Sequence, residues 1–267
     1  MSLRATLRAT PALLRVGLVE SLAYRAELLV WILATTMPLV MMALFATVAR
    51  EAPIGRYGEG EVIAYFLATF LVRQLTGSWA AWEINMDVKQ GTLATRLLRP
   101  IHPLWAYACE GIAALPLRLV LSAPLAIVAL ILTSRGHLAR DPVIWGMFAV
   151  ATLLAWAITF LINAALGSLA LFVDSSLRWV DVYLLLFFVG SGYLVPVDVF
   201  PGWARTVLDA LPFRYQIGFP VELMVNVHDR AHALALLGRQ LAWTLALLGA
   251  TLALFHRGLR RFGAFGG

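Results

Sequence analysis

The sequence predicts an all-α integral membrane protein with six transmembrane helices, on three observations. Of the 267 residues, 61% are hydrophobic and only 13% are charged, and the mean hydropathy is +0.82. A soluble domain has about 45–50% apolar and about 25% charged residues, so this chain has too few charges to build a surface that faces water. Long uncharged stretches also recur along the whole length, which favours one membrane domain over residues 1–267.

The first 24 residues are predicted to form an amphipathic helix that lies on the membrane surface. Leucines recur at helical spacing beside arginines, the pattern typical of a helix in the headgroup plane. These residues are Leu3, Leu7, Leu14 and Leu18, beside Arg4, Arg8 and Arg15. The apolar stretch that follows is too long for the hydrophobic part of a signal peptide, so we expect it to be retained as the first span.

Six apolar stretches follow, each long enough to cross about 30 Å of hydrocarbon. They cover residues 28–49, 61–82, 105–133, 143–173, 178–197 and 237–256. Tryptophans, among them Trp79 and Trp82, fall mostly near the ends of these stretches, where the amphipathic ring prefers the interface. Basic residues are more numerous on the side of the N-terminus, and the long segment before the last span inflates the count on the opposite side. We therefore expect both termini in the cytoplasm.

Small residues on the fourth and fifth predicted spans indicate close helix packing. Gly167 lies among alanines and a serine on the fourth span, and Gly190 and Gly192 occur on the fifth. Such patches let two helix backbones approach each other.

The formal net charge of +6 does not indicate a nucleic-acid partner, because the 21 basic residues are scattered between apolar stretches and form no block. Membrane orientation explains them better. The single cysteine, Cys109, cannot form an internal disulfide, and its place at the start of an apolar stretch suggests packing.

Two connections between the spans are not plain loops. Residues 83–104 open with charged side chains, continue as a predicted helix after Gly91 and stop at Pro100. Residues 196–236 are too apolar for a solvated loop, but prolines divide them into pieces too short to cross the membrane. We expect short helices that dip into the outer leaflet, because backbone in hydrocarbon has to satisfy its own hydrogen bonds.

Motifs in these two connections resemble the ABC-2 type permease family. They are QGTLATRLLRP after the second span, SGYLVPVDVFPGW and then LPFRYQIGFPVEL after the fifth, and a Gly-Gly ending. LVRQLTGSW in the second span extends the likeness to nearly the whole chain. The resemblance implies the six-helix membrane subunit of a bacterial ABC exporter, located in the inner membrane, that moves a hydrophobic or amphipathic substrate.

The resemblance also implies partners. These are two copies of a separate ABC ATPase, which would hold ATP and magnesium, and a second permease, homologous or identical. Residues 83–104 would be the cytoplasmic coupling segment that rests in a groove of the ATPase, and residues 196–236 the outer re-entrant segment. The implied coupling residues are Glu83, Asp87, Lys89, Gly91, Thr92, Arg96, Arg99 and Pro100. The residues singled out in the re-entrant segment are Pro196, Phe200, Pro201, Trp203, Pro212, Phe213 and Pro220.

The residues themselves exclude a P-loop on this chain. A P-loop needs Gly-Lys-Ser/Thr to hold phosphates, and the only lysine, Lys89, lies between Val88 and Gln90. We therefore expect no ATPase site, no catalytic residue and no cofactor here, so that energy for transport comes from a partner. The alternative for residues 83–104 is a solvated helix that only carries positive charge on the cytoplasmic side.

Two arginines fall within predicted spans, Arg73 near the centre of the second and Arg118 near the centre of the third. Each costs roughly 2.5–3.5 kcal/mol unless it is paired or faces water, so we assign both to the substrate path. Glu110, about two helical turns before Arg118, joins them, as do Thr159 and Asn163 of the fourth span. The alternative is that the third helix projects into the cytoplasm, with Glu110 in water and Arg118 snorkelling.

Other functions have weaker support. His228 and His232 flank Asp229 at a spacing that mimics the zinc motif H-E-x-x-H, but no third ligand is apparent, so we predict no metal site. An intramembrane protease would need Ser191 close to His256, and the predicted topology puts these residues on opposite sides of the bilayer. A membrane scaffold without transport activity remains a further alternative.

Overall fold

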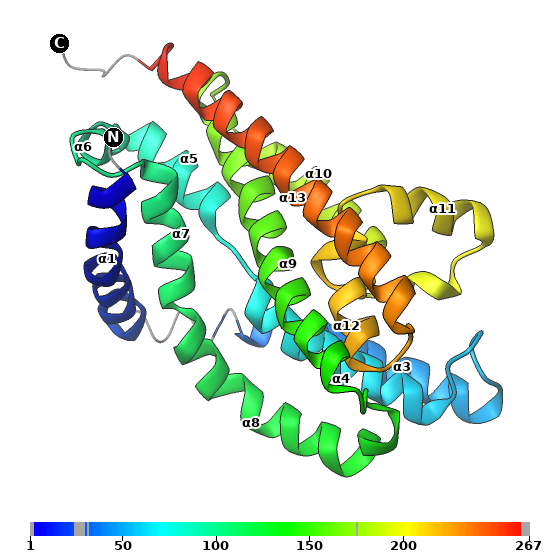
Figure 1. Ribbon diagram of the computed structural model, residues 1–267. Coiled ribbons are helices and arrows are strands. Elements are labelled where there is room, and N and C mark those ends of the chain that lie inside the picture. The colour runs from blue at the N-terminus through cyan, green and yellow to red at the C-terminus, as the bar shows by residue number, and fades with distance from the viewer. Residues whose placement is uncertain (1–2, 24–29, 31, 175, 263–267) are drawn as a thin grey trace.

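The structure is a computed structural model that describes residues 3–23, 30, 32–174 and 176–262. These residues form helices joined by short connections and contain no β-strand, only an isolated bridge between Ile54 and Tyr57. Figure 1 shows α6 and the end of α13 at one end of the molecule, and the α3–α4 and α8–α9 connections at the other. The all-α prediction is confirmed; the Gly-Gly ending and the start of the first predicted span lie outside the described residues.

Four helical stretches in the described part of the chain are long and apolar enough to cross a membrane. They are Ile32–Glu51, Pro103–Thr133, Pro142–Leu171 and Arg230–Leu259, and they coincide with the first, third, fourth and sixth predicted spans. The second predicted span falls on α4 (Glu59–Thr76), whose 18 residues include three charged side chains, and the fifth on α10 (Leu177–Gly190), which has only 14 residues. The helices therefore support a multi-pass membrane protein, and the count of six stays a prediction.

The N-terminal helix α1 (Leu3–Ala23) packs along α7 (Pro103–Ala113). Trp105 of α7 donates a hydrogen bond from Nε1 to Thr10 Oγ1 at 3.0 Å. At Gly17 the two helices come so close that a Cβ there would lie 2.9 Å from Ala113 Cβ. The predicted helix at residues 1–24 is present over its described part, and its place in the headgroup layer stays a prediction.

The first span is broken just before α3 (Met37–Glu51) because Pro38 has no amide hydrogen to continue the helix. The Thr35 hydroxyl donates to Ile32 O at 2.9 Å and the Thr36 hydroxyl to Leu33 O at 2.7 Å. The same two carbonyls also accept from the amides of Thr35 and Thr36, each at 3.2 Å. The turn before the break is therefore held by hydrogen bonds within the protein, as backbone in hydrocarbon requires.

The second span, predicted as continuous over residues 61–82, is interrupted at residues 77–79. Gly77 ends α4 in an extended conformation, and α5 (Ala80–Gln90) starts three residues later. Arg118 Nη1 donates to Gly77 O at 3.1 Å, and so occupies a carbonyl that a continuing helix would have used. After α5, Gly91 adopts a left-handed φ of 75° and leads into the short α6 (Leu93–Leu97).

The third span is built from α7 and α8 (Leu115–Ser134), which meet at Ala114, and a 3-10 turn η1 (Arg135–His137) follows. The central helix α9 (Pro142–Ser168) begins at Asp141, whose side chain accepts a hydrogen bond from Val143 N at 3.0 Å. It contacts α4, α5, α10, α12 and α13, and it continues into the 3-10 turn η2 (Leu169–Leu171). The bundle is therefore organised around α9.

The fifth predicted span, 178–197, ends earlier as a helix than the hydropathy suggests. Gly192, just after α10, has a φ of 83°, and Tyr65 donates to its carbonyl at 2.8 Å. A Cβ at Gly192 would lie only 2.6 Å from the Tyr65 hydroxyl, so the turn needs glycine. The chain leaves the helix here because this turn directs it back into the bundle.

The segment between this turn and the last helix consists of short elements. They are η3 (Val197–Val199), α11 (Gly202–Ala210), η4 (Arg214–Gln216) and α12 (Gly218–Met224), and α13 (Arg230–Leu259) follows. Residues 214–224 are buried throughout, whereas α11 has no buried residue. The segment therefore has a peripheral part, α11, and after it a buried part at residues 214–224, which we call the inserted segment. Short broken helices are present as expected, and their place in the outer leaflet stays a prediction.

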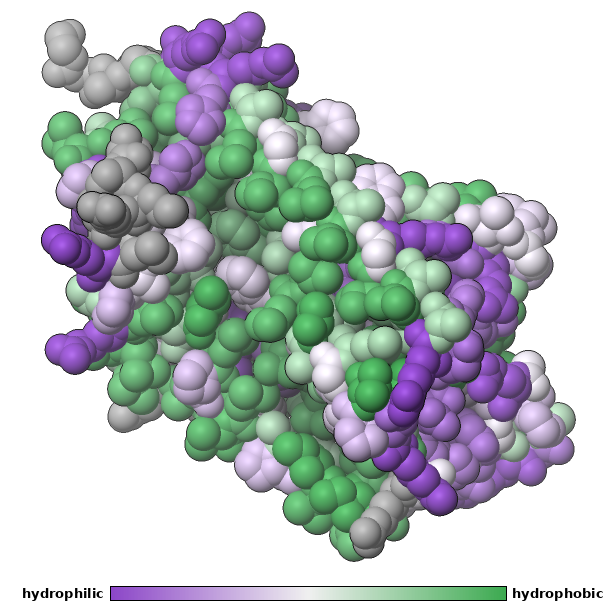
Figure 2. Space-filling model, viewed as in Figure 1, coloured by the Kyte–Doolittle hydropathy of each residue, from purple (hydrophilic) through white to green (hydrophobic). Residues whose placement is uncertain are grey.

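The outer surface of the bundle is strongly apolar. Figure 2 shows a hydrophobic band between hydrophilic patches at the two ends of the molecule. Large apolar side chains on α8 are among the most exposed, with Leu125 at 81% and Leu132 at 79%. A continuous exposed apolar surface of this kind marks contact with lipid or another protein.

The predicted small-residue contact on α9 leads to a first test. A Cβ at Gly167 would lie 2.8 Å from Ile84 Cβ and 3.0 Å from Ala81 O, whereas a Cβ at Gly146 of the same helix meets nothing within 4 Å. We expect Gly167→Ala to destabilise the protein by about 1–3 kcal/mol through overpacking between α5 and α9. Gly146→Ala should be neutral or stabilising by up to about 1 kcal/mol.

The measurement is SDS-induced unfolding of both purified variants in mild detergent. Equal effects of the two substitutions would contradict the close α5–α9 contact.

Candidate functional site

Two cavities adjoin at the break between α4 and α5. The first, of about 520 Å³, lies among α3, α4, α10 and Tyr193, and we call it the Arg73 cavity. The second, of about 620 Å³, lies among α1, α5, α7 and the start of α8, and we call it the Glu83 cavity. Trp79 and Trp82 line both. The interrupted second span therefore lies between the two cavities and contributes wall residues to both.

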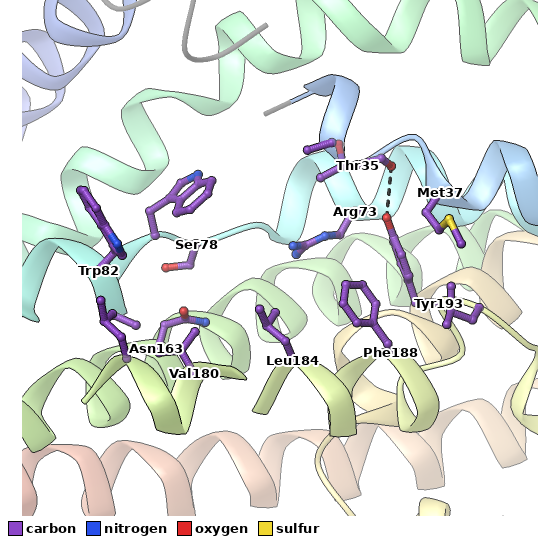
Figure 3. Close-up of a pocket in the computed structure, with 15 residues that line it drawn as sticks. Thr35, Met37, Arg73, Ser78, Trp82, Asn163, Val180, Leu184, Phe188 and Tyr193 are labelled. Carbon is purple, nitrogen blue, oxygen red and sulfur yellow. Dashed lines mark hydrogen bonds between the residues drawn. The ribbon is translucent and has the colours of Figure 1, made fainter. Parts of the chain in front are cut away.

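The Arg73 cavity is mostly apolar and carries one positive charge. Arg73 comes from the last turn of α4 and is the one charged side chain among the described residues that line the cavity. Its Cζ lies 5.1 Å from the ring centroid of Phe187, a cation–π distance. In Figure 3 the guanidinium of Arg73 points between Ser78 and Leu184.

The polar side chains around Arg73 are fixed by hydrogen bonds to backbone. The Tyr193 hydroxyl donates to Thr35 O at 3.2 Å, the bond drawn in Figure 3. Asn163 also lines the cavity and donates from Nδ2 to Thr159 O at 2.9 Å. The wall therefore has a defined shape, which a binding site needs.

The other intramembrane arginine, Arg118, lines the Glu83 cavity and is only 6% exposed. Its bond to Gly77 O compensates part of the cost of burial and caps the end of α4, where the helix dipole favours a cation. Glu110, named with Arg118 for a polar strip on one helix face, lines the same cavity, and the strip stays a prediction. The alternative, in which Arg118 snorkels to water, does not fit a side chain buried to this degree.

The Glu83 cavity carries acidic side chains, in contrast to its neighbour. Glu20 of α1, Glu83 of α5 and Glu110 of α7 all line it. Burial raises the pKa of the Glu83 carboxyl from 4.5 to about 7, and the nearby charge of Glu110 adds to this effect. Glu83 therefore changes its charge near neutral pH.

Arg96 holds the predicted coupling segment to α7. Its Nε lies 2.6 Å from Asp87 Oδ2 and its Nη1 2.7 Å from Glu110 Oε1, and its Cζ lies 4.2 Å from the centroid of the Tyr107 ring. Tyr107 and Thr92 both donate to the Asp87 carboxylate, at 2.5 Å and 2.6 Å. We call this group the Arg96 network; it joins α5, α6 and α7 into one unit.

The tip of the coupling segment is exposed and partly apolar. Leu98 is 87% exposed, and Leu97 beside it is 37% exposed. The charged neighbours Lys89 and Arg99, and also Gly91 and Pro100, are exposed as well. Of the coupling residues named from the sequence, these four are therefore exposed without being part of the network. Asp87, Arg96 and the likewise exposed Thr92 belong to the network, and Glu83 lines the cavity.

A buried charge cluster fixes the inserted part of the re-entrant segment. Arg214 Nη2 donates to Glu222 Oε2 at 2.6 Å, and both side chains are only 1% exposed. His228 Nε2 lies 2.7 Å from the same oxygen, and Asp209 forms a further ion pair with Arg214. Burial alone would raise the pKa of Glu222, but the charge of Arg214 and the bonds from Arg214 and His228 outweigh it and lower the pKa to about 2.

Gln216 joins the same segment to the surrounding helices. Its Oε1 accepts from the Tyr183 hydroxyl at 2.6 Å and from Thr159 Oγ1 at 3.1 Å. Thr159, named for the substrate path, lines neither cavity. Through its bond to Gln216, Thr159 instead links α9 to the inserted segment.

The re-entrant residues named from the sequence divide between core and surface. Pro196 and Pro220 are buried, Phe200, Pro212 and Phe213 are partly buried, and Pro201 and Trp203 are exposed. Trp203 on α11 is 76% exposed and Val207, one turn later, 53%. The exposed face of α11 is therefore apolar, as expected of a short helix that faces lipid.

The residues weighed for other chemistries have different neighbours from those that such chemistries need. His228 lies 4.9 Å ring to ring from His232 but bonds to Glu222, and among the described residues no group of three potential ligands is placed to hold a metal ion. Ser191 accepts from Gly218 N through its carbonyl at 2.7 Å, while His256 bonds to Leu252 O and lies beside His102. Ser191 and His256 share no contact partner among the described residues.

Several residues of the site were not anticipated from the sequence. Trp79 and Trp82 were assigned to the interface, but both line the cavities and are 48% and 52% exposed. Tyr107 and Tyr193 lie in predicted spans and were not singled out, but each lines one of the cavities. The sequence does contain an indication of the helix break beside the tryptophans. Gly77 and Ser78, which break a helix readily, directly precede Trp79.

Comparison with protein-family models gives a match over most of the chain. A family model described as ABC-2 family transporter protein matches residues 30–266. This is the family that the motifs in the two connections resemble, so the resemblance is confirmed. A search of curated proteins returns no match to the chain.

The buried charge cluster predicts an asymmetry between single and double substitutions. Glu222→Ala leaves the Arg214 charge buried without its main partner, which should cost about 3–5 kcal/mol of unfolding free energy, whereas replacing both residues as Arg214→Met with Glu222→Leu should cost much less. As a control, Arg230→Ala breaks the exposed pair with Asp141 and should cost far less than Glu222→Ala, because solvent screens this pair. SDS titration measures all three, and a cost for Glu222→Ala no larger than that of the control would refute the cluster's role.

Glu83 predicts a pH dependence. Because its folded pKa is raised from 4.5 to about 7, the protonated form is favoured in the folded state, and the protein should lose stability as pH rises through this window. Glu83→Gln should remove this loss, so that the variant's advantage in thermal midpoint grows from about pH 4.5 to about pH 7. The exposed Glu51→Gln variant controls for the loss of a carboxylate, and parallel profiles for wild type and Glu83→Gln would show that the site is open to water.

Proposed function

Because the chain belongs to the ABC-2 transporter family and is therefore a membrane permease of an ABC transporter, we propose that it exports a hydrophobic or amphipathic substrate. The observation that carries the proposal is the connection between cavity and tip. Helix α5 starts at the wall shared by both cavities and ends beside the exposed tip of the coupling segment. Helix α5 would thus transmit a movement of the tip to the walls of both cavities.

The proposed topology has six spans, with α4 and α10 as the second and fifth. The charged residues of α4 lie at its two ends, Glu59 and Glu61 in the first turn and Arg73 in the last, so its middle is apolar. α10 has only 14 residues. In the proposal, residues 191–195 and the inserted segment complete the fifth crossing of the membrane. With six spans both termini are cytoplasmic, and the membrane is the bacterial inner membrane.

The proposed energy source is a pair of ABC ATPase subunits, which would hold ATP and magnesium. The exposed Leu98, next to Arg99 in the chain, and the exposed Lys89 at the end of α5 offer apolar and positively charged groups, a chemistry suited to a groove on another protein. The Arg96 network supports transmission of force, because its four hydrogen bonds and ion pairs tie the tip to α7. Arg96 is accordingly a positioning residue and not a contact.

The proposed substrate path includes the two adjoining cavities, with Arg73, Asn163, Arg118 and Glu110 in their walls. A second permease, homologous or identical, would complete the transporter by covering part of the exposed apolar surface. The inserted segment at residues 214–224 would close the path towards the outer side.

The test is copurification of ATPase activity with the full-length tagged chain from its native membranes. The wild-type chain should carry an ATPase, and Leu98→Asp with Arg99→Glu should reduce the associated activity by about tenfold or more, equivalent to about 1.4 kcal/mol of lost binding. Arg140→Glu, an exposed charge reversal in the α8–α9 connection at the other end of the molecule, is the matched control.

Two outcomes would count against the proposal. If the wild-type chain carries no ATPase, a membrane scaffold becomes the better account. If the tip variant retains full ATPase activity while the chain is still folded, the contact lies elsewhere.

A further inference from the structure

We propose that the Arg73 cavity binds an amphiphile with an anionic headgroup, with the anion at Arg73 and the apolar chain against the tryptophan wall. This inference rests on the function proposed above, because it names the class of substrate. The inference goes beyond the proposed function because it assigns a negative charge to the headgroup of the substrate. The apolar character of the cavity alone does not give this sign.

The size and wall of the cavity suit a small amphiphile. A volume of about 520 Å³ lies within the range of about 300–1,000 Å³ that is typical of ligand sites. Leu184, Phe188, Trp79 and Trp82 provide an extended apolar surface, and Figure 3 shows the labelled members of this wall facing one space. An alkyl or ring system can therefore be buried beside the single charged group.

The charge of the wall decides the sign of the headgroup. Among the described lining residues Arg73 is charged and none is acidic, whereas Glu20, Glu83 and Glu110 all lie on the Glu83 cavity. Attraction between Arg73 and an anion is strengthened where water is scarce, and repulsion of a cation is strengthened equally. A guanidinium also offers paired N–H donors that match a carboxylate or a phosphate.

The surroundings of Arg73 add to the positive potential. Arg118 bonds to Gly77, which lies four residues after Arg73, so the two guanidinium groups are both at the end of α4. The neighbouring α5 begins at Ala80, with Ser78 on the cavity wall, and directs the positive end of its dipole towards the break. Arg118 and the start of α5 therefore both add positive potential beside Arg73.

Arg73 also has a structural role that the test has to separate from binding. It lies in the last turn of α4 and over the ring of Phe187 at 5.1 Å, and a cation stabilises both positions. Lysine could supply the positive charge in this structural role. The charge preference for a ligand, by contrast, is visible in the wild-type chain without any substitution.

The experiment uses the purified full-length chain in phosphatidylcholine nanodiscs and follows quenching of tryptophan fluorescence by brominated amphiphiles. The probes are 11-bromoundecanoate, 11-bromoundecanol and 11-bromoundecyltrimethylammonium, which share a chain and differ in charge. Bromine quenches tryptophan on contact. The chain has seven further tryptophans, so the part of the quenching that is lost in a Trp79→Phe, Trp82→Phe variant reports occupancy. We expect the anionic probe to bind about tenfold or more tightly than the neutral one, and the cationic probe to bind most weakly.

The variants then assign the preference to Arg73. Arg73→Gln should reduce the affinity for the anionic probe by about tenfold and leave the neutral probe unchanged, and Arg73→Lys should retain most of the preference. Arg140→Gln, the same substitution at an exposed arginine outside both cavities, should change nothing. If Arg73→Gln fails to fold, competition of unbrominated undecanoate against undecanol in the wild-type chain still decides the question.

Equal binding of the three probes to the wild-type chain, or an anionic preference that survives in folded Arg73→Gln, would overturn this inference. Because the assay needs no ATPase, such a result would leave the proposed function intact. Conversely, absence of a copurifying ATPase would overturn the proposed function whatever the probes show.

Discussion

Every backbone amide and carbonyl in the hydrocarbon layer has to find a partner within the protein, and the breaks in the helices of this chain are arranged around that constraint. At the first break the hydroxyls of Thr35 and Thr36 bond back to the preceding turn. At the second, Arg118 takes the carbonyl of Gly77, and after α10 Tyr65 takes that of Gly192. Each departure from a continuous helix is thus supported by a side chain from nearby or from another helix.

These breaks also determine where polar chemistry can be placed in an apolar bundle. The interruption at residues 77–79 opens space on both sides, and the two cavities meet there. A side chain that caps one helix end, Arg118, permits another, Arg73, to face a cavity at a position where an isolated charge would be costly. The same break that needs support therefore supplies the candidate site.

Charges elsewhere in the molecule act in pairs and hold irregular segments in place. The Arg96 network makes α5, α6 and α7 one unit, and Arg214 with Glu222 fixes the inserted segment, which Gln216 joins to α9 and α10. The Arg96 network thus holds the segment that is proposed to receive force from the ATPase. The Arg214–Glu222 pair holds the segment that is proposed to close the path on the outer side. Helix α9 lies between them and contacts both α5 and α12, so it provides the rigid frame against which either could move.

The sequence by itself determined the all-α membrane class, four of the spans, the two irregular connections and the family, because hydropathy over about 20 residues and local motifs are properties of neighbouring residues. It could name Arg73 and Arg118 as exceptional, since a charge within a span is visible without a structure. Only the tertiary structure decided that Arg118 caps α4, that Arg96 is held in an internal network and that Thr159 bonds to Gln216. These roles depend on pairs of residues between 14 and 57 positions apart, and no local pattern records which distant helix lies opposite a given side chain.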